Sequence, residues 1–143
     1  MTLYQNGHFY ATGIALSPPS GEPVPFIEVE MAGPAGIYQP VAGKLDTGAF
    51  MTILTFATGG ALGMGDPKIG ALHQGSAQAA NGGPLDYYVH HVAVRVRNPM
   101  GPDLEFLLEA GFAPAMSLDL FGIDWVRHVC VAIDARQVHL LKD

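Results

Sequence analysis

The fold of this chain is decided by the stretch Leu45-Asp46-Thr47-Gly48-Ala49, which follows an apolar segment over residues 37–45. The pattern predicts a strand that ends in one carboxylate, followed by a small hydroxyl residue and a glycine. Glycine lets the backbone turn where a side chain would not fit. The tripeptide Asp-Thr-Gly is weak evidence by itself, because a chain of this length has roughly a few per cent chance of containing it. Its meaning therefore depends on the sequence around it.

The composition indicates one compact β-rich domain. The chain has 143 residues, enough for one complete core, and 49% of them are hydrophobic while only 14% are charged. This balance is typical of a globular protein and not of a disordered one. The 18 glycines and 11 prolines favour many short strands and turns over long helices.

Charge and cysteine content exclude several kinds of partner. A net charge of −6 gives no basic surface for nucleic acid or an anionic membrane. The single cysteine, Cys130, excludes an internal disulfide framework. We see neither a signal peptide at the N-terminus nor a segment long enough to span a membrane, so the expectation is a soluble cytoplasmic protein.

Residues 1–25 are predicted to form an N-terminal arm. Residues 8–16 have the pattern of one short strand, and the proline-rich segment 17–23 then interrupts regular structure. Two interpretations stay open at this point. The arm is either a loosely packed terminus or a segment that pairs with a partner subunit.

The centre of the chain predicts strands around the Asp-Thr-Gly loop. Residues 26–31 alternate apolar and acidic side chains, residues 37–45 return as the second strand, and residues 50–54 leave the loop as a third. A short helix is expected within residues 55–62. Gly59 and Gly60 weaken it, because each glycine in a helix costs about 1 kcal/mol relative to alanine.

The remaining segments complete an all-β pattern. A long hairpin is predicted from residues 72–79 and 87–96, because Asn81-Gly82 is a strong hairpin signal. Residues 104–110 form a further strand, although their pattern also allows a helix. A short helix is expected over residues 123–129, with Trp125 and Val126 reaching the core. Segments 130–134 and 137–141 form the final hairpin.

Three segments in this order resemble the retropepsin-like, single-domain aspartic protease family. They are Asp-Thr-Gly-Ala at 46–49, Ala-Ala-Asn-Gly-Gly at 79–83 and Leu-Asp-Leu-Phe-Gly-Ile-Asp-Trp at 118–125. The resemblance spans residues 26–141. It implies an all-β fold, namely a closed, partly orthogonal acid-protease-type barrel with one or two short helices. It also implies that residues 26–143 form the protease domain.

The resemblance implies peptide hydrolysis by a water molecule held between two carboxylates. Two carboxylates about 3 Å apart share one proton, so that one acts as an acid and the other as a base, as is known for aspartic proteases. This chain has one Asp in the required context, because Asp119, Asp124 and Asp134 lack the following hydroxyl residue and glycine. The second carboxylate must therefore come from another copy, which predicts a homodimer acting on a peptide or protein substrate.

Each site residue takes its expected role from the resemblance. Asp46 is the catalytic residue. The active-site loop is supported by Thr47, Gly48, Ala49 and Gly122, and the flap and groove that bind substrate consist of Ala80, Asn81, Gly82, Gly83, Leu120 and Phe121. Lys44 and Phe50 depart from the family pattern, which has an apolar and a small polar residue there. These departures leave open a non-proteolytic dimerisation or peptide-binding module as the alternative.

Other chemistry is less well supported by the sequence. His90 and His91 are adjacent on a predicted strand and so point to opposite faces, and we expect neither a metal nor a cofactor. His128 and Cys130 could pair as a base and a thiol nucleophile if that segment is extended. A lone cysteine in an apolar run is more often a core residue.

Overall fold

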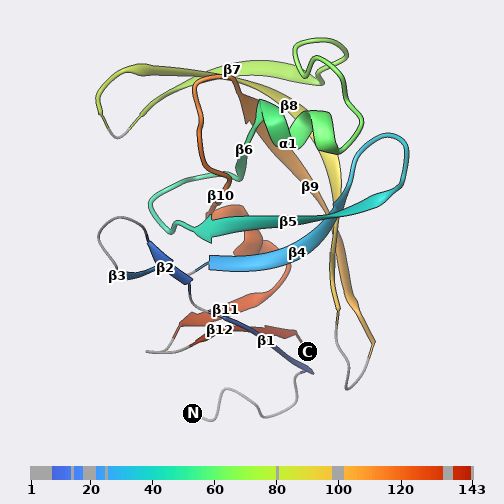
Figure 1. The fold of residues 1–143 in the computed structure, drawn as a ribbon, viewed down its shortest axis with the longest axis vertical. Helices are drawn as coiled ribbons and strands as arrows, with labels where there is room; N and C mark the ends of the chain where they lie inside the picture. Colours follow the sequence, from blue (N-terminus) through green and yellow to red (C-terminus); the bar gives the residue numbers. More distant parts are fainter. Residues whose placement is uncertain are drawn as a thin grey trace.

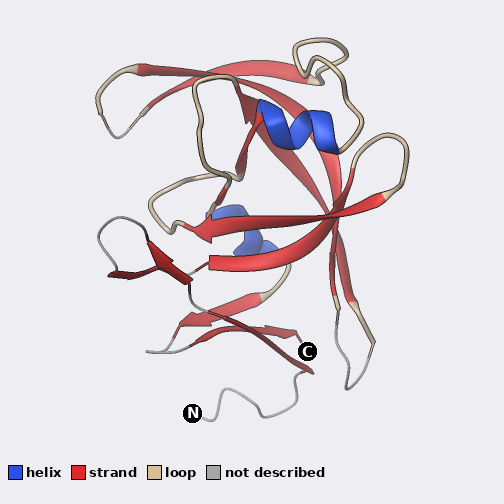
Figure 2. Ribbon diagram, viewed as in Figure 1, coloured by secondary structure: helices blue, strands red, loops and turns tan. Residues whose placement is uncertain are grey.

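A computed structural model describes residues 8–13, 15–17, 22–24, 26–79, 81–97, 102–133 and 137–142. The strands in chain order are β1 (His8–Gly13), β2 (Ala15–Ser17), β3 (Glu22–Val24), β4 (Phe26–Ala32), β5 (Tyr38–Leu45), β6 (Ile53–Thr55), β7 (His73–Gln78), β8 (Pro84–Val96), β9 (Leu104–Ala113), β10 (Leu120–Phe121), β11 (Cys130–Ile133) and β12 (Gln137–Lys142). The helices are α1 (Phe56–Ala61) and the 3₁₀ helix η1 (Ile123–Arg127). Strands dominate the structure (Figure 2).

A closed ring of strands forms the body of the molecule (Figure 1). Its largest sheet has the order β4-β5-β10-β6-β9-β8-β7, and an additional pairing of β4 with β8 closes it. Strand β10 runs parallel to β5, and β6 runs parallel to β9. Strand β7 pairs only with β8 among the described strands, so this hairpin extends away from the ring. The predicted closed all-β barrel is therefore confirmed.

Smaller sheets contain the two ends of the described chain. Strand β1 pairs antiparallel with β12 of the same chain, and β12 pairs with β11. Strands β2 and β3 form a separate two-stranded sheet. The predicted final hairpin, β11 with β12, is present. The division of the chain at residue 25 stays a prediction.

An ion-pair cluster lies where β4 meets β8 and closes the ring. Glu30 is the cross-strand partner of Arg95 and contacts its Nη2 at 2.5 Å, and Arg97 Nε reaches the same carboxylate at 2.6 Å. The hydrogen bond from Arg95, followed by that from Arg97, lowers the pKa of Glu30. The stabilisation from this charge is therefore present at neutral pH and is lost as the pH falls through the lowered pKa.

The core is built around two stacked aromatic rings. Phe121 and Trp125 lie with ring centroids 4.8 Å apart and nearly parallel, and both side chains are fully buried. Gly43 of β5 makes room for this stack, because a Cβ at that position would lie 2.6 Å from the Phe121 ring. Val126, which the sequence placed in the core, is 57% exposed instead. The tight turn of η1 directs Trp125 inward and Val126 outward.

Both predicted helices are present, and both are short. Helix α1 is capped by Thr55, whose side chain accepts a hydrogen bond from the Thr58 N–H. The strand expected over residues 50–54 begins only at Ile53, because the backbone N–H of Thr52 is bound by the Asp124 carboxylate instead of by a neighbouring strand. None of the helices among the described residues has the length and hydropathy needed to cross a membrane.

The two adjacent glycines of α1 give a matched test of its packing. A Cβ at Gly59 would lie 2.8 Å from the Pro67 ring, whereas a Cβ at Gly60 would meet nothing within 4 Å. We expect Gly60→Ala to raise the free energy of unfolding by about 0.5–1 kcal/mol, because alanine loses less backbone entropy. Gly59→Ala should lower it, because the new methyl group overlaps its neighbours. Urea denaturation of both variants checks the pair, and equal shifts would contradict the packing described here.

Candidate active site

Strand β5 delivers Asp46 to the end of the barrel. The backbone N–H of Lys44 donates to the Asp119 carbonyl at 3.0 Å, and that of Asp46 donates to the Phe121 carbonyl at 2.9 Å. These bonds continue the parallel pairing of β5 with β10 one residue beyond the strand. The position of Asp46 is therefore fixed by a backbone ladder on its N-terminal side.

A tight turn holds the Asp46 carboxylate. Its Oδ1 accepts a hydrogen bond from the Gly48 N–H at 2.9 Å, and its carbonyl accepts one from the Ala49 N–H at 3.1 Å. Among the described residues, the other carboxylate oxygen has no hydrogen-bond donor. Asp46 is half-buried, and both Thr47 and Gly48 are exposed. The loop thus presents a fixed carboxylate with one oxygen open to solvent.

Gly122 lies directly beneath this loop. A Cβ at Gly122 would lie 2.4 Å from the carbonyl carbon and oxygen of Met51 and 2.9 Å from the Ala49 oxygen. The next residue, Ile123, donates its N–H to the Ala49 carbonyl at 2.8 Å. Any larger residue at position 122 would push the active-site loop outward.

The fully buried Thr52 side chain joins the loop to η1. Its hydroxyl donates to Asp124 Oδ1 at 2.9 Å and accepts from the Trp125 Nε1–H at 3.1 Å and the Gly122 N–H at 3.3 Å. The Thr52 N–H donates to the other Asp124 oxygen at 2.9 Å. One residue therefore satisfies polar groups of three residues in the distant segment 122–125.

The Asp119 carboxylate likewise joins two distant segments, here at the start of α1. Its carboxylate accepts hydrogen bonds from the Thr55 N–H at 2.8 Å and the Thr58 hydroxyl at 2.6 Å. The sequence singled out Asp119 and Asp124 only as carboxylates without the catalytic context. Both act as structural acceptors, and sequence reasoning missed these roles and that of Thr52. The only sequence feature that pointed to such a role was Thr52 itself, a threonine within an apolar run.

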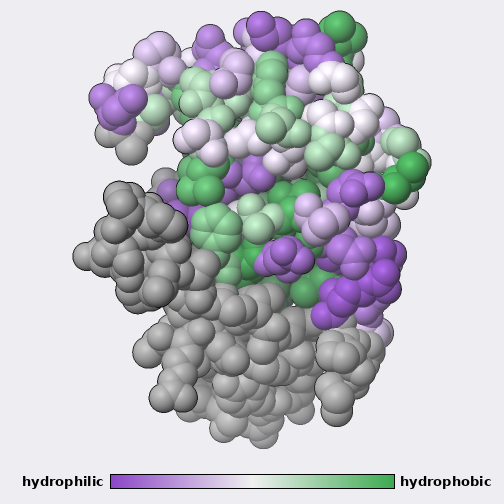
Figure 3. Space-filling view, in the orientation of Figure 1, coloured by the Kyte–Doolittle hydropathy of each residue, from purple (hydrophilic) through white to green (hydrophobic). Residues whose placement is uncertain are grey.

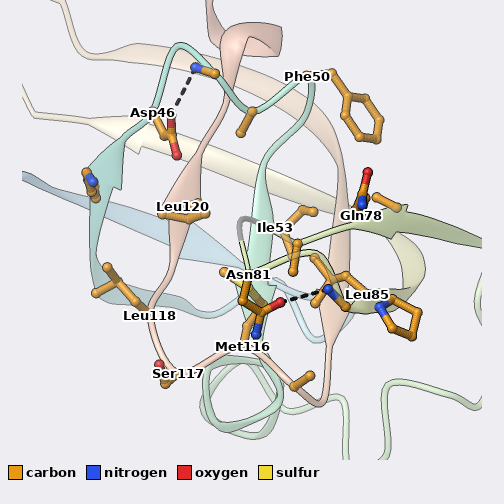
Figure 4. Close-up of a pocket in the computed structure, with 18 residues that line it drawn as sticks. Asp46, Phe50, Ile53, Gln78, Asn81, Leu85, Met116, Ser117, Leu118 and Leu120 are labelled. Carbon is orange, nitrogen blue, oxygen red and sulfur yellow. Dashed lines mark hydrogen bonds between the residues drawn. The ribbon is translucent and has the colours of Figure 1, made fainter.

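A cavity of about 770 Å³ opens beside Asp46, between the active-site loop and the β7–β8 hairpin. Figure 3 shows it as a notch between the hairpin tip and the body of the molecule. In Figure 4, Asp46 lies at one edge of the cavity, and Gln78 and Leu85 of the hairpin lie at the opposite edge. Of the predicted site residues, the cavity is lined by Asp46, Gly48, Ala49, Asn81, Gly83 and Leu120.

The other predicted residues lie elsewhere. Thr47 and Gly122 belong to the loop and its support but do not line the cavity. Gly82, at the hairpin tip, does not line it either. Phe121, expected in the groove wall, lies instead in the core, because neighbouring residues of β10 point to opposite faces and only Leu120 faces the cavity. Ala80 lies outside the described residues.

The hairpin tip over the cavity is a tight turn. The Gly82 N–H donates to the Ala79 carbonyl at 2.9 Å, and the Ala79 N–H donates to the Gly83 carbonyl at 2.8 Å. Asn81 Oδ1 accepts from the Gly83 N–H at 2.9 Å. Gly82 has a φ of +84°, a conformation that favours glycine. The sequence signal Asn81-Gly82 thus marks the turn as expected.

Several cavity residues were not among the expected site residues. The apolar ones include Ile53, Leu85, Met116 and Leu118. Lys44 and Phe50, noted in the sequence only as departures from the family pattern, also line it. The Phe50 side chain is 59% exposed and lies edge-on to Tyr87, with ring centroids 6.4 Å apart.

Comparison with known proteins supports the fold. No family model and no curated protein sequence matches the chain. Among solved structures, the chain is similar to a retropepsin-like aspartic protease from Rickettsia conorii, with a TM-score of 0.55 and 14% sequence identity. The match covers 94% of this chain and 91% of that one. The chain therefore has an acid-protease-type fold.

Replacing the Thr52 hydroxyl tests the support of the loop. Thr52→Val keeps the shape of the side chain but leaves the indole N–H, the Gly122 N–H and an Asp124 oxygen without their partner. We expect the free energy of unfolding to fall by about 2 kcal/mol, because unsatisfied buried polar groups are costly. Thr52→Ser is the control, since it keeps the hydroxyl and loses one methyl group, worth about 1 kcal/mol. A valine variant more stable than the serine variant in urea denaturation would contradict this role.

Proposed function

We propose that this chain is an aspartic endopeptidase that works as a homodimer, with Asp46 of each chain activating one water molecule. The observation that carries the proposal is the placement of Asp46. Its fixed carboxylate opens onto a cavity of about 770 Å³ that lies between the Asp46 loop and the β7–β8 hairpin. The fold of the solved structure described above is consistent with this chemistry.

The mechanism follows from two Asp46 carboxylates that share a proton. The ionised one removes a proton from water as the water attacks the carbonyl carbon of the scissile amide. The protonated one donates a hydrogen bond and then a proton to the carbonyl oxygen. The Gly48 N–H stabilises the carboxylate of its own chain and fixes its orientation.

The second carboxylate has no source within the described part of one chain. Of the residues that the structure describes, Asp46 is the only carboxylate residue that lines the cavity. The oxygens of Asp119 and Asp124 are already bound by threonine N–H and hydroxyl groups. Neither can move to Asp46 without leaving buried donors unsatisfied. A second copy related by a two-fold axis supplies the missing group.

The surface next to the loop is suited to such a contact. Ile123 and Val126 are 46% and 57% exposed. With Leu45, Asp46 and Thr47 they surround a shallow depression on the outer side of the loop. Exposed apolar side chains next to an exposed loop fit an isologous contact, in which the same patch meets itself across the axis. Residues 26–143 would form the protease domain in each copy.

Mixing wild-type chains with Asp46→Asn chains tests both the dyad and the assembly. The purified variant should cleave no peptide of an unbiased library, because an amide supplies neither the acid nor the base. Excess variant should also lower wild-type activity, since mixed dimers contain one carboxylate. Sedimentation of each sample gives the size of the active species.

The control is Glu28→Gln, which removes an exposed carboxylate of β4 outside the cavity and should leave wild-type activity unchanged on mixing. Cleavage by Asp46→Asn would place the chemistry elsewhere. A fully active monomer would overturn the homodimer. Peptide binding without cleavage by the wild type would support the non-proteolytic peptide-binding module instead.

The hairpin tip gives a separate test of the proposed flap. Gly82 and Gly36 both have positive φ, +84° and +72°, and a Cβ would meet nothing within 4 Å at either site. Valine should strain both turns and lower stability by similar amounts. Only Gly82→Val should also lower kcat/KM per folded dimer, by roughly tenfold or more, because misplaced groups over the cavity impair catalysis. Equal kcat/KM for the two variants would show that this hairpin is not a flap.

A further inference from the structure

Lys44, two residues before Asp46, is a positively charged residue that lines the cavity. Side chains at positions i and i+2 of a strand lie on the same face. The N–H groups of Lys44 and Asp46 both donate to the β10 segment, and Leu45 between them is buried. Both side chains line the cavity. The ammonium group therefore shares the face on which the proposed hydrolysis takes place.

This charge is unpaired among the described residues. The described ion pairs join Glu30 to Arg95 and Arg97, and Arg97 to Asp103. None of them involves Lys44, and among the described residues its hydrogen bonds are made by its backbone. Within the described part of the chain, Lys44 and Asp46 are the only residues with a formal charge at neutral pH that line the cavity. An anionic group entering the cavity would thus find one cation available to it.

The rest of the cavity lining is mostly apolar. Ile53, Leu85, Met116, Leu118 and Leu120 supply apolar surface, and the hairpin adds the small residues Ala77, Ala79 and Gly83. A dyad that shares one proton carries a negative charge, which repels an acidic side chain close to it. Lys44 offsets this repulsion for a substrate side chain that lies next to it. The remaining cavity lining is suited to apolar substrate side chains.

We infer that Lys44 selects peptides with a glutamate or aspartate next to the scissile bond, flanked by apolar residues. This inference rests on the proposed function. In a two-fold dimer, one Lys44 lies on each side of the dyad, so an acidic residue is accepted on either side of the bond. The contact is a charge-assisted hydrogen bond between an ammonium group and a carboxylate.

Two degenerate peptide pools test the inference. In one pool a fixed glutamate is flanked by apolar residues, and in the other a glutamine takes its place. Wild-type protein should cleave the glutamate pool faster by about fivefold in kcat/KM at low salt, a size suited to a partly exposed ion pair. The preference should shrink as salt is added. It should disappear in Lys44→Met and reverse in Lys44→Glu.

The matched control is Lys68→Met, which removes an exposed lysine outside the cavity and should keep the full preference. Binding of both pools to Asp46→Asn separates this inference from the proposed function. Cleavage of both pools at equal rates would overturn the inference alone. Absence of cleavage with a Lys44-dependent binding preference would overturn the protease and support only the recognition of acidic peptides by Lys44. Equal binding without cleavage would overturn both.

Discussion

The hydroxyl of Thr52 is the contact on which the site depends. A fully buried hydroxyl must find partners, and this one bonds with three groups that would otherwise be unsatisfied. It allows the Trp125 indole to be completely buried, and Trp125 in turn stacks on Phe121. The Phe121 carbonyl then accepts the N–H of Asp46. The Asp46 carboxylate is thus positioned from the core outward, through groups that are themselves fixed.

The two sides of the cavity differ in how firmly they are held. On the Asp46 side, Gly122 lies against the loop backbone, and hydrogen bonds link the loop to β10 and η1. On the other side, the hairpin β7–β8 extends from the ring, and the exposed Gly82 at its tip meets few atoms. Few contacts mean a low cost of local opening. A fixed carboxylate facing a less restrained hairpin is the arrangement that a closing cover needs.

Local patterns predicted most of this fold, and contacts between distant segments explain what they missed. Alternation and the Asn81-Gly82 turn placed the central strands and the hairpin, and Asp46 was found through its motif. The Thr52 hydroxyl bond to Asp124 spans 72 positions, and no local pattern marks such a contact. Leu120 and Phe121 are equally apolar neighbours, so only the pairing of β10 with β5 and β6 decides which one faces the cavity. The outward direction of Val126 likewise depends on how η1 turns.

Among the described residues, each chain brings one carboxylate to the cavity, so the proposed chemistry depends on assembly. In one chain, Asp46 lines the cavity and has one carboxylate oxygen without a donor among the described residues. A second copy would bring a like charge to this position, which is unfavourable unless a proton is shared. The apolar surface of Ile123 and Val126 would then have to supply the association energy that brings the carboxylates together. In the proposed dimer, the proton that the two carboxylates share is also the proton that peptide cleavage requires, so assembly would itself activate the dyad.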